Sequence, residues 1–267
     1  MLAFAGNSIL CRFALKTTTI DAASFTSIRL VSAASILWVI LLLLRKGGKV
    51  LGNWPSALAL FVYAAGFSFA YINLKAGTGA LLLFGSVQTS MISFGLWSGE
   101  RFNVLQIGGF VLAVTGLVAL VFPGLSAPPL LSSVLMVVAG VAWGIYSLRG
   151  RGAGDPTMTT GGNFIRTLPM AAILTLASWS HLQIDTRGTI LAIASGAITS
   201  GIGYAIWYSA LPSLKATQAA TVQLSVPVIA AIGGIVLLGE PLSLQLVLAS
   251  FAILAGVSLV IFYKQRA

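Results

Sequence analysis

The chain alternates between long apolar runs and short breaks that carry glycine, proline or charged residues. The runs lack strand-like alternation and are far longer than the strands of a membrane barrel, so the pattern predicts helices. The clearest breaks lie at residues 45–49, 99–101, 123–124, 150–152, 185–187 and 239–241. We expect ten helices, near residues 2–15, 24–44, 55–74, 78–97, 104–122, 130–148, 157–179, 188–210, 216–238 and 244–263.

The lengths of these runs match the thickness of a lipid bilayer. A spanning helix needs about 20 residues, so ten spans leave only about 67 of the 267 residues for connections. No separate soluble domain fits in that remainder. The first run is the short one, because about 14 residues rise about 21 Å against a hydrocarbon core of about 30 Å. We expect either that this helix continues through residues 16–20 or that the native N-terminus is longer. No basic segment precedes the run, which argues against a cleaved signal peptide.

Composition supports an all-α integral membrane protein. Hydrophobic residues make up 58% of the chain and charged residues 7%, with a mean hydropathy of +1.00. A soluble domain carries about 25% charged residues, so an ordinary soluble enzyme or a disordered chain is excluded. The single cysteine, Cys11, rules out a disulfide scaffold. The net charge of +10 is better explained by membrane orientation than by nucleic-acid binding.

The basic residues of the connections predict the orientation. With a cytoplasmic N-terminus, nine cations fall inside and three outside, which the positive-inside rule favours. The three outside are Lys16, Lys75 and Arg187, and the nine inside are Arg45, Lys46, Lys49, Arg101, Arg149, Arg151, Lys215, Lys264 and Arg266. We therefore expect both termini in the cytoplasm, with the chain in a bacterial inner membrane.

Two halves of the sequence resemble each other. With a shift of 140 residues and no gap, Lys75 falls on Lys215 and Glu100 on Glu240, and Ile28-Arg29 matches Ile165-Arg166 at a shift of 137. Five helices per half is an odd number, so the halves must lie inverted in the membrane, as in many transporters. We expect ten transmembrane helices in two inverted five-helix repeats, over residues 1–125 and 126–267, with a binding site between them near the midplane.

These features together resemble a known family. An arginine early in the second helix of each half, and Gly-Glu-Arg or Gly-Glu-Pro at residues 99–101 and 239–241, are similar to the drug/metabolite transporter superfamily and its EamA-type ten-helix members. Residues 224–228, Leu-Ser-Val-Pro-Val, resemble the best-marked part of the family pattern. The resemblance covers the whole chain and implies export of small metabolites, often amino acids, by alternating access, with similarity to bacterial aromatic amino acid exporters. Val87 stands opposite Pro227, and this departure leaves the substrate open.

Ionisable side chains within the expected spans are few. Arg29 and Arg166 lie inside helices, either to bind a substrate carboxylate or, as we favour, to reach the nearer interface and hydrogen-bond loop carbonyls. Glu100 and Glu240 begin connections into the last helix of each half, where a carboxylate favours the helix N-terminus. No Asp, Glu, Lys or His lies near mid-span, so strict coupling to protons is not expected. Arg29, Arg166, Glu100, Glu240 and Pro227 are assigned gating or structural roles, and Pro169 and Pro227 are expected to kink their helices.

Aromatic, amide and hydroxyl side chains define the expected cavity. An aromatic wall with a few amides suits an amphipathic solute, although such residues also pack helices and form interfacial belts. Gln88, the deepest amide, is the strongest candidate. The full set of expected substrate-binding residues is Asn7, Tyr63, Phe67, Gln88, Trp143, Tyr146, Tyr204, Trp207 and Gln223.

Other chemistry finds little support in the sequence. No phosphate-binding loop occurs, and one histidine with one cysteine does not make a metal site, so no cofactor or metal is expected. The expected partners are a small-molecule substrate and the lipid bilayer, not nucleic acid, in a monomer or dimer. The function expected is secondary transport of amino acids, aromatic or otherwise neutral. Alternatives are a multidrug or nucleotide-sugar transporter of the same superfamily and, with less support, a membrane enzyme or a channel.

Overall fold

Helices make up the described part of the chain. The computed structural model describes residues 1–44, 51–99, 101–122, 128–150, 154–210 and 222–263, and within them it contains no strand. The elements are α1 (Leu2–Thr17), α2 (Ala22–Leu43), α3 (Trp54–Tyr71), α4 (Ala76–Trp97), α5 (Val104–Val121), α6 (Leu130–Gly150), α7 (Pro156–Ala177), the short η1 (Trp179–His181), α8 (Thr186–Ile193), the π-helical η2 (Ala194–Ile202), α9 (Gly203–Ala210), α11 (Ser225–Leu238) and α12 (Leu244–Tyr263). The first helix extends past the expected residue 15 but ends at Thr17.

Polar residues just before the helices set where several of them begin. Asp21, Asn53, Asn103, Asp155 and Asp185 cap α2, α3, α5, α7 and α8 by accepting backbone N–H groups of the first turn. At Asp21 burial raises the pKa of the carboxyl, but hydrogen bonds from Ser24, Gln183 and Ala23 outweigh it and hold the pKa below its ordinary value.

Two of the expected helices differ from the sequence prediction. Residues 188–210 form α8 and α9 with the π-helical η2 between them, where one regular helix was expected. The helix expected at 216–238 appears, in its described part, as residues 222–223, a turn at Leu224, and then α11. Pro227 lies in the first turn of α11, because its ring excludes a regular helical hydrogen bond to the carbonyl four residues earlier. The described helix is interrupted at Leu224, next to this proline, and Pro169 lies inside α7.

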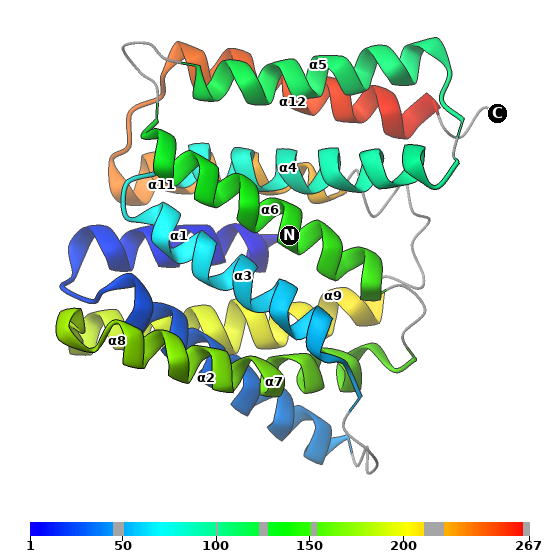
Figure 1. The fold of residues 1–267 in the computed structure, drawn as a ribbon. Coiled ribbons are helices and arrows are strands. Elements are labelled where there is room, and N and C mark those ends of the chain that lie inside the picture. Colours follow the sequence, from blue (N-terminus) through cyan, green and yellow to red (C-terminus); the bar gives the residue numbers. More distant parts are fainter. Residues whose placement is uncertain (45–50, 100, 123–127, 151–153, 211–221, 264–267) are drawn as a thin grey trace.

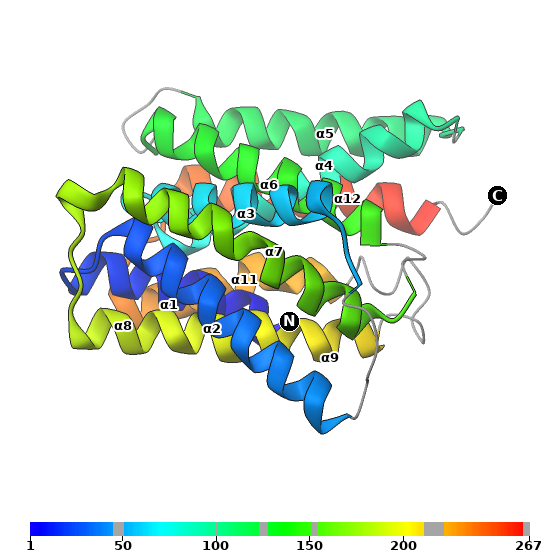
Figure 2. The same ribbon diagram turned by 60° about the horizontal axis from the view of Figure 1, so that its bottom comes forward.

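The helices form layers, with α5 and α12 outermost and α4 and α11 beneath them (Figure 1). The most extensive pairings are α5 with α12, α3 and α4 with α6, and α2 with α7 and η2. Figure 2 shows α2 crossing obliquely past α8, with which it is in contact. Glycines permit the closest approaches: a Cβ on Gly109 would meet the carbonyl of Gly256 in α12, and one on Gly196 would meet the backbone of Arg29 in α2.

The connections α1–α2, α3–α4, α7–α8 and α11–α12 lie together at one end of the bundle, which we name the Glu240 end. At this end Asp21 accepts the backbone N–H of Gln183, and Lys16 donates to the carbonyl of Leu238. The other end carries the C-terminal ends of α2, α4 and α6.

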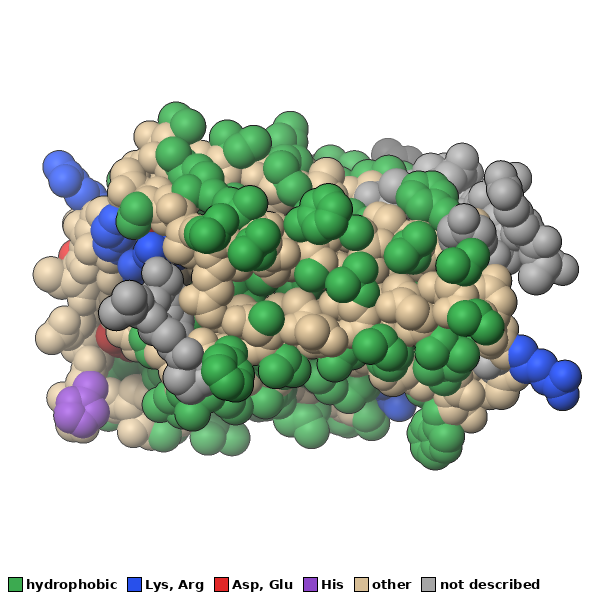
Figure 3. All heavy atoms as spheres, turned by 90° about the horizontal axis from the view of Figure 1, so that it is seen from above, with side chains coloured by type: hydrophobic (Ala, Val, Ile, Leu, Met, Phe, Trp, Pro, Cys, Tyr) green, Lys and Arg blue, Asp and Glu red, His purple; other side chains and the backbone are tan. Residues whose placement is uncertain are grey.

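The outer surface suits a lipid environment. Seven helices of the described chain are long and apolar enough to cross a membrane. They are α2 to α6, the continuous Thr186–Ala210 and most of α12. Of the rest, α1 and α11 are shorter, and α7 is long enough but more polar. Seen over α5 and α12, hydrophobic side chains cover the middle of the molecule, and charged side chains lie mostly toward its two ends (Figure 3).

Candidate functional site

An aromatic cavity lies at the centre of the bundle, where helices from the first and second parts of the sequence meet. Its lining comes from α1, α3, α4, α6 and α9, and comprises Phe4, Asn7, Tyr63, Phe67, Leu83, Phe84, Trp143 and Tyr204. The free volume is only ≈ 10 Å³, room for about one water molecule. The structure therefore has this cavity in a closed form.

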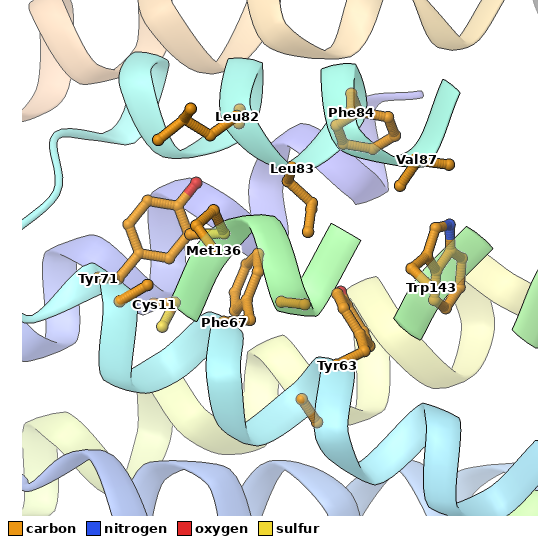
Figure 4. Close-up of a cluster of buried hydrophobic side chains, with 14 of the residues drawn as sticks. Cys11, Tyr63, Phe67, Tyr71, Leu82, Leu83, Phe84, Val87, Met136 and Trp143 are labelled. Atoms are coloured by element: carbon orange, nitrogen blue, oxygen red, sulfur yellow. The ribbon is translucent and has the colours of Figure 1, made fainter. Parts of the chain in front are cut away.

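Ring contacts build the wall of this cavity. Trp143 lies at its centre, with ring centroids 4.8 Å from Tyr63 and 5.0 Å from Tyr204. Phe4 contacts Trp143 edge to face at 6.2 Å, and Phe67 follows Tyr63 at 5.6 Å. Figure 4 shows Tyr63 and Phe67 projecting from one face of α3, with Leu83 and Phe84 above them on α4 and Trp143 beside them on α6. Such a wall offers a large apolar contact area to the body of a solute.

A network of polar side chains closes one side of the cavity. Asn7 donates through Nδ2 to the Tyr63 hydroxyl at 3.1 Å and accepts at Oδ1 from Ser195 at 2.6 Å. The Thr199 hydroxyl lies 3.4 Å from this Oδ1, and its nearer acceptor is the Ser195 carbonyl at 2.7 Å. Ser195 and Thr199 belong to the π-helical η2, and both hydroxyls face Asn7 of α1. π-Helical segments of this kind are frequent at functional sites.

Arg29 lies directly behind Tyr63 and is 2% exposed. Its Nη2 donates to the Tyr63 hydroxyl at 2.9 Å and its Nε to the Ser200 hydroxyl at 3.2 Å. The guanidinium carbon lies 4.8 Å from the centroid of the Phe67 ring and 5.3 Å from that of Tyr63. Its Nη1 has no hydrogen-bond partner. Arg29 is thus a buried cation stabilised by aromatic faces and neutral hydroxyls.

The arginine predictions had opposite outcomes. Arg166 donates to the carbonyls of Leu51 and Gly162, the loop-carbonyl contact that was expected. For Arg29 the expectation was wrong, because its side chain remains in the core. Arg29 is only the eighth residue of α2, but α3, with its aromatic rings, and η2 enclose it there.

The carboxylate of Glu240 ties several helices together. Its Oε1 accepts from Arg12 Nε at 3.0 Å, and its Oε2 accepts the backbone N–H of Ala76, the first residue of α4, at 2.7 Å. Arg12 also donates to the carbonyls of Tyr71 and Ile72. Glu240 was expected to stabilise the N-terminus of the helix that follows it, α12. That expectation was wrong, since Glu240 caps α4 and Ser243 caps α12. Glu100 lies outside the described residues.

Five of the nine expected binding residues line the central cavity, namely Asn7, Tyr63, Phe67, Trp143 and Tyr204. Tyr146 stacks behind Trp143 at 5.4 Å, and Trp207 contacts Phe4 at 6.0 Å. Gln88 is buried on α4, and Gln223 directly precedes the turn at Leu224; neither belongs to this lining.

Sequence reasoning missed several residues of the site. Phe4, Leu83 and Phe84 line the cavity, and Arg12 closes the Glu240 end. Ser195, Thr199 and Ser200 form the polar network, and their spacing within a glycine-rich segment was the available signal.

A larger groove lies on the outside of the bundle between α4, α5 and α6, with a volume of ≈ 650 Å³. Ser86, Thr89 and Ser90 contribute hydroxyls, and valine and leucine side chains form most of the remaining lining. Val118 is 59% exposed, so the groove opens on the outer surface. It is formed by α4 and α5 of the first half and α6 of the second, but unlike the central cavity it has no lining residue from α1, α3 or α9.

Comparison with known proteins agrees with these features. The model of the EamA-like transporter family matches residues 130–262. Protein PA1977 of Pseudomonas aeruginosa is 55% identical over 262 residues, covering 98% of this chain and 91% of that protein. The threonine/homoserine exporter RhtA of Salmonella typhimurium is 31% identical over 154 residues, 55% of this chain and 51% of that protein. A crystal structure covers 100% of this chain and matches with a TM-score of 0.66 at 18% identity, which shows a shared fold. The chain therefore belongs to the EamA-like transporter family of the drug/metabolite transporter superfamily.

Proposed function

We propose that the chain moves aromatic or other neutral amino acids across a bacterial inner membrane by alternating access, with the central cavity as the substrate site. The observation that carries this proposal is the closed aromatic cavity lined by α1, α3, α4, α6 and α9. Phe4, Trp143 and Tyr204 provide an apolar wall, and Asn7 and Tyr63 provide polar groups beside it. The name of RhtA, a threonine/homoserine exporter, agrees with an amino acid as cargo.

The proposal includes two inverted five-helix repeats, over residues 1–125 and 126–267. The helix contacts support it. In the expected series of ten helices, the repeat relates each helix to the one five places later. This relates α2 to α7, α4 to α11 and α5 to α12, and the two helices of each of these pairs are in contact. The same relation predicts that the contact between α3 and α6 has a counterpart between α1 and the segment of α8 and η2, and this contact is also present. A pattern that maps onto itself is what a twofold axis in the membrane plane produces.

We further propose that the Glu240 end faces away from the cytoplasm. It carries Lys16, Lys75 and Arg187, the three cations assigned to the outside. The contacts of Glu240 with Arg12 and Ala76 close this end in the structure. Arg166 has a structural role at the opposite end, and Pro227 marks the start of α11 as a point of bending.

Transport in this proposal does not require a proton gradient. The described carboxylates Asp21, Asp155, Asp185 and Glu240 all lie at helix ends, so none within a described span can exchange a proton for the substrate. A purified sample in liposomes should accumulate labelled amino acids by exchange at equal pH on both sides. The screen includes quaternary amines and nucleotide sugars. Transport of those solutes alone, or strict dependence on a pH gradient, would contradict the proposal.

A further inference from the structure

The hydrogen bonds around the central cavity leave a particular kind of group unused. The Tyr63 oxygen has two lone pairs, and it accepts from Asn7 Nδ2 at 3.1 Å and from Arg29 Nη2 at 2.9 Å. What remains to Tyr63 is its own O–H. Tyr63, 4% exposed, therefore meets the cavity as a donor.

Asn7 likewise offers a hydrogen-bond donor to the cavity. Its Oδ1 accepts from the Ser195 hydroxyl at 2.6 Å, and one N–H of its Nδ2 donates to the Tyr63 hydroxyl. The second N–H of Nδ2 is left. Trp143, the central residue of the wall, also carries a donor and no acceptor on its indole. The polar groups that a solute meets at this wall are thus mainly hydrogen-bond donors, namely N–H and O–H groups.

Arg29 adds an uncompensated charge. Its Nη1 is buried and has no partner. Its side chain contacts Tyr63, Phe67 and Ser200, none of them a carboxylate. The described carboxylates are held at helix ends, as at Asp21 and Glu240. A buried cation without an anion is costly, and a bound anion would lower that cost.

We propose that the cavity is a receptor for a carboxylate, which binds to the donors of Tyr63 and Asn7 in front of the Arg29 charge while its apolar body lies against Phe4 and Trp143. The transported class is then monocarboxylates with an apolar body, of which an amino acid is one case. This inference rests on the proposed function and extends it, because no described carboxylate is placed to bind an ammonium group. A carboxylate without an amino group neutralises Arg29, whereas a zwitterion leaves the site with its positive charge.

Ligand binding to the purified protein tests this separately from transport. The probes are 3-phenylpropanoate, its amide 3-phenylpropanamide, 3-phenylpropylamine and L-phenylalanine, titrated by tryptophan fluorescence and by the midpoint of thermal unfolding. We expect 3-phenylpropanoate to bind at least as tightly as L-phenylalanine and at least about tenfold more tightly than its amide, because the charge strengthens each hydrogen bond. The amine should not bind. Equal binding of propanoate and amide, tighter binding of the amine, or no binding of the propanoate would overturn the proposal.

Two tyrosine variants locate the carboxylate. Tyr63→Phe removes one donor and should weaken propanoate binding about tenfold while leaving amide binding within about twofold. Tyr71→Phe is the matched control, since Tyr71 lies two turns further along α3 and donates to the carbonyl of Ala76. It should leave the ratio of propanoate to amide unchanged. Equal losses for both probes in Tyr63→Phe would contradict the assignment, and the wild-type probe series decides the matter even if this variant fails to fold.

The two proposals fail in different ways. If amino acids exchange in liposomes but 3-phenylpropanoate neither binds nor exchanges, the proposed function stands and the carboxylate receptor is wrong. If 3-phenylpropanoate binds with the expected selectivity but amino acids do not exchange, the receptor stands and amino acids are not the cargo.

Discussion

Replacing Glu240 with glutamine should open the Glu240 end. The carboxylate is 7% exposed and accepts from Arg12 Nε at 3.0 Å and from the N–H of Ala76 at 2.7 Å. Glutamine retains an acceptor but loses the charge that strengthens both bonds. Hydrogen bonds to charged groups contribute about 1.5–3 kcal/mol, so the loss corresponds to an increase of about 10- to 150-fold in the ratio of open to closed molecules.

The single cysteine of the chain reports this opening directly. Cys11 precedes Arg12 on α1 and is fully buried, so a maleimide reaches it only when the helices around it separate. At constant pH, the labelling rate of Glu240→Gln should exceed that of the wild type by about 10- to 150-fold. The natural sequence needs no engineered thiol for this measurement.

Lys16→Gln provides the control at the same end. Lys16 Nζ donates to the carbonyl of Leu238 at 2.8 Å, but this bond is exposed and contributes little. Its loss should change the labelling rate about threefold at most. The reasoning is refuted if Glu240→Gln elutes as a folded protein and labels at the wild-type rate, or if Lys16→Gln accelerates labelling equally.

Two further predictions concern stability. Gly109→Ala should lower the free energy of unfolding by about 1–3 kcal/mol, because its Cβ would meet the carbonyl of Gly256. The neighbouring Gly108→Ala is the control and should be nearly neutral, because its Cβ meets nothing within 4 Å. Thermal unfolding in detergent compares the two variants, and equal unfolding midpoints would contradict the packing. The pKa of Asp21 is lower in the folded than in the unfolded chain, so its contribution is present above the ordinary value of 3.8 and is lost as the pH falls further. The midpoint of unfolding should therefore fall between pH 5 and pH 3 by less in Asp21→Asn than in the wild type; an identical fall would refute this.

The sequence was most informative where a residue's role follows from local spacing. Tyr63 and Phe67, which lie four residues apart and therefore share a helix face, were expected to bind substrate, and both line the cavity. Long apolar runs likewise predicted most helices to within a few residues, because bilayer thickness sets their length.

It was least informative where a role depends on a partner far along the chain. The depth of Arg29 in α2 gave no sign that the rings of α3 and the π-helical η2 would enclose it. Glu240 was expected to act at its own helix, but its two partners, Arg12 and Ala76, lie 228 and 164 residues away. Regular helical periodicity also does not reveal the change from α to π turns in η2, which contains Ser195 and Thr199.

Exchange of labelled L-phenylalanine in proteoliposomes tests the central claim most directly. Vesicles preloaded with unlabelled amino acid and kept at equal pH on both sides should show a transient overshoot of labelled amino acid, because alternating access couples entry to exit. Trp143→Ala, at the centre of the aromatic wall, should abolish the overshoot, while Trp97→Ala, 87% exposed at the end of α4, should retain it. No overshoot in the wild type, or the same overshoot in Trp143→Ala, would contradict transport through the central cavity.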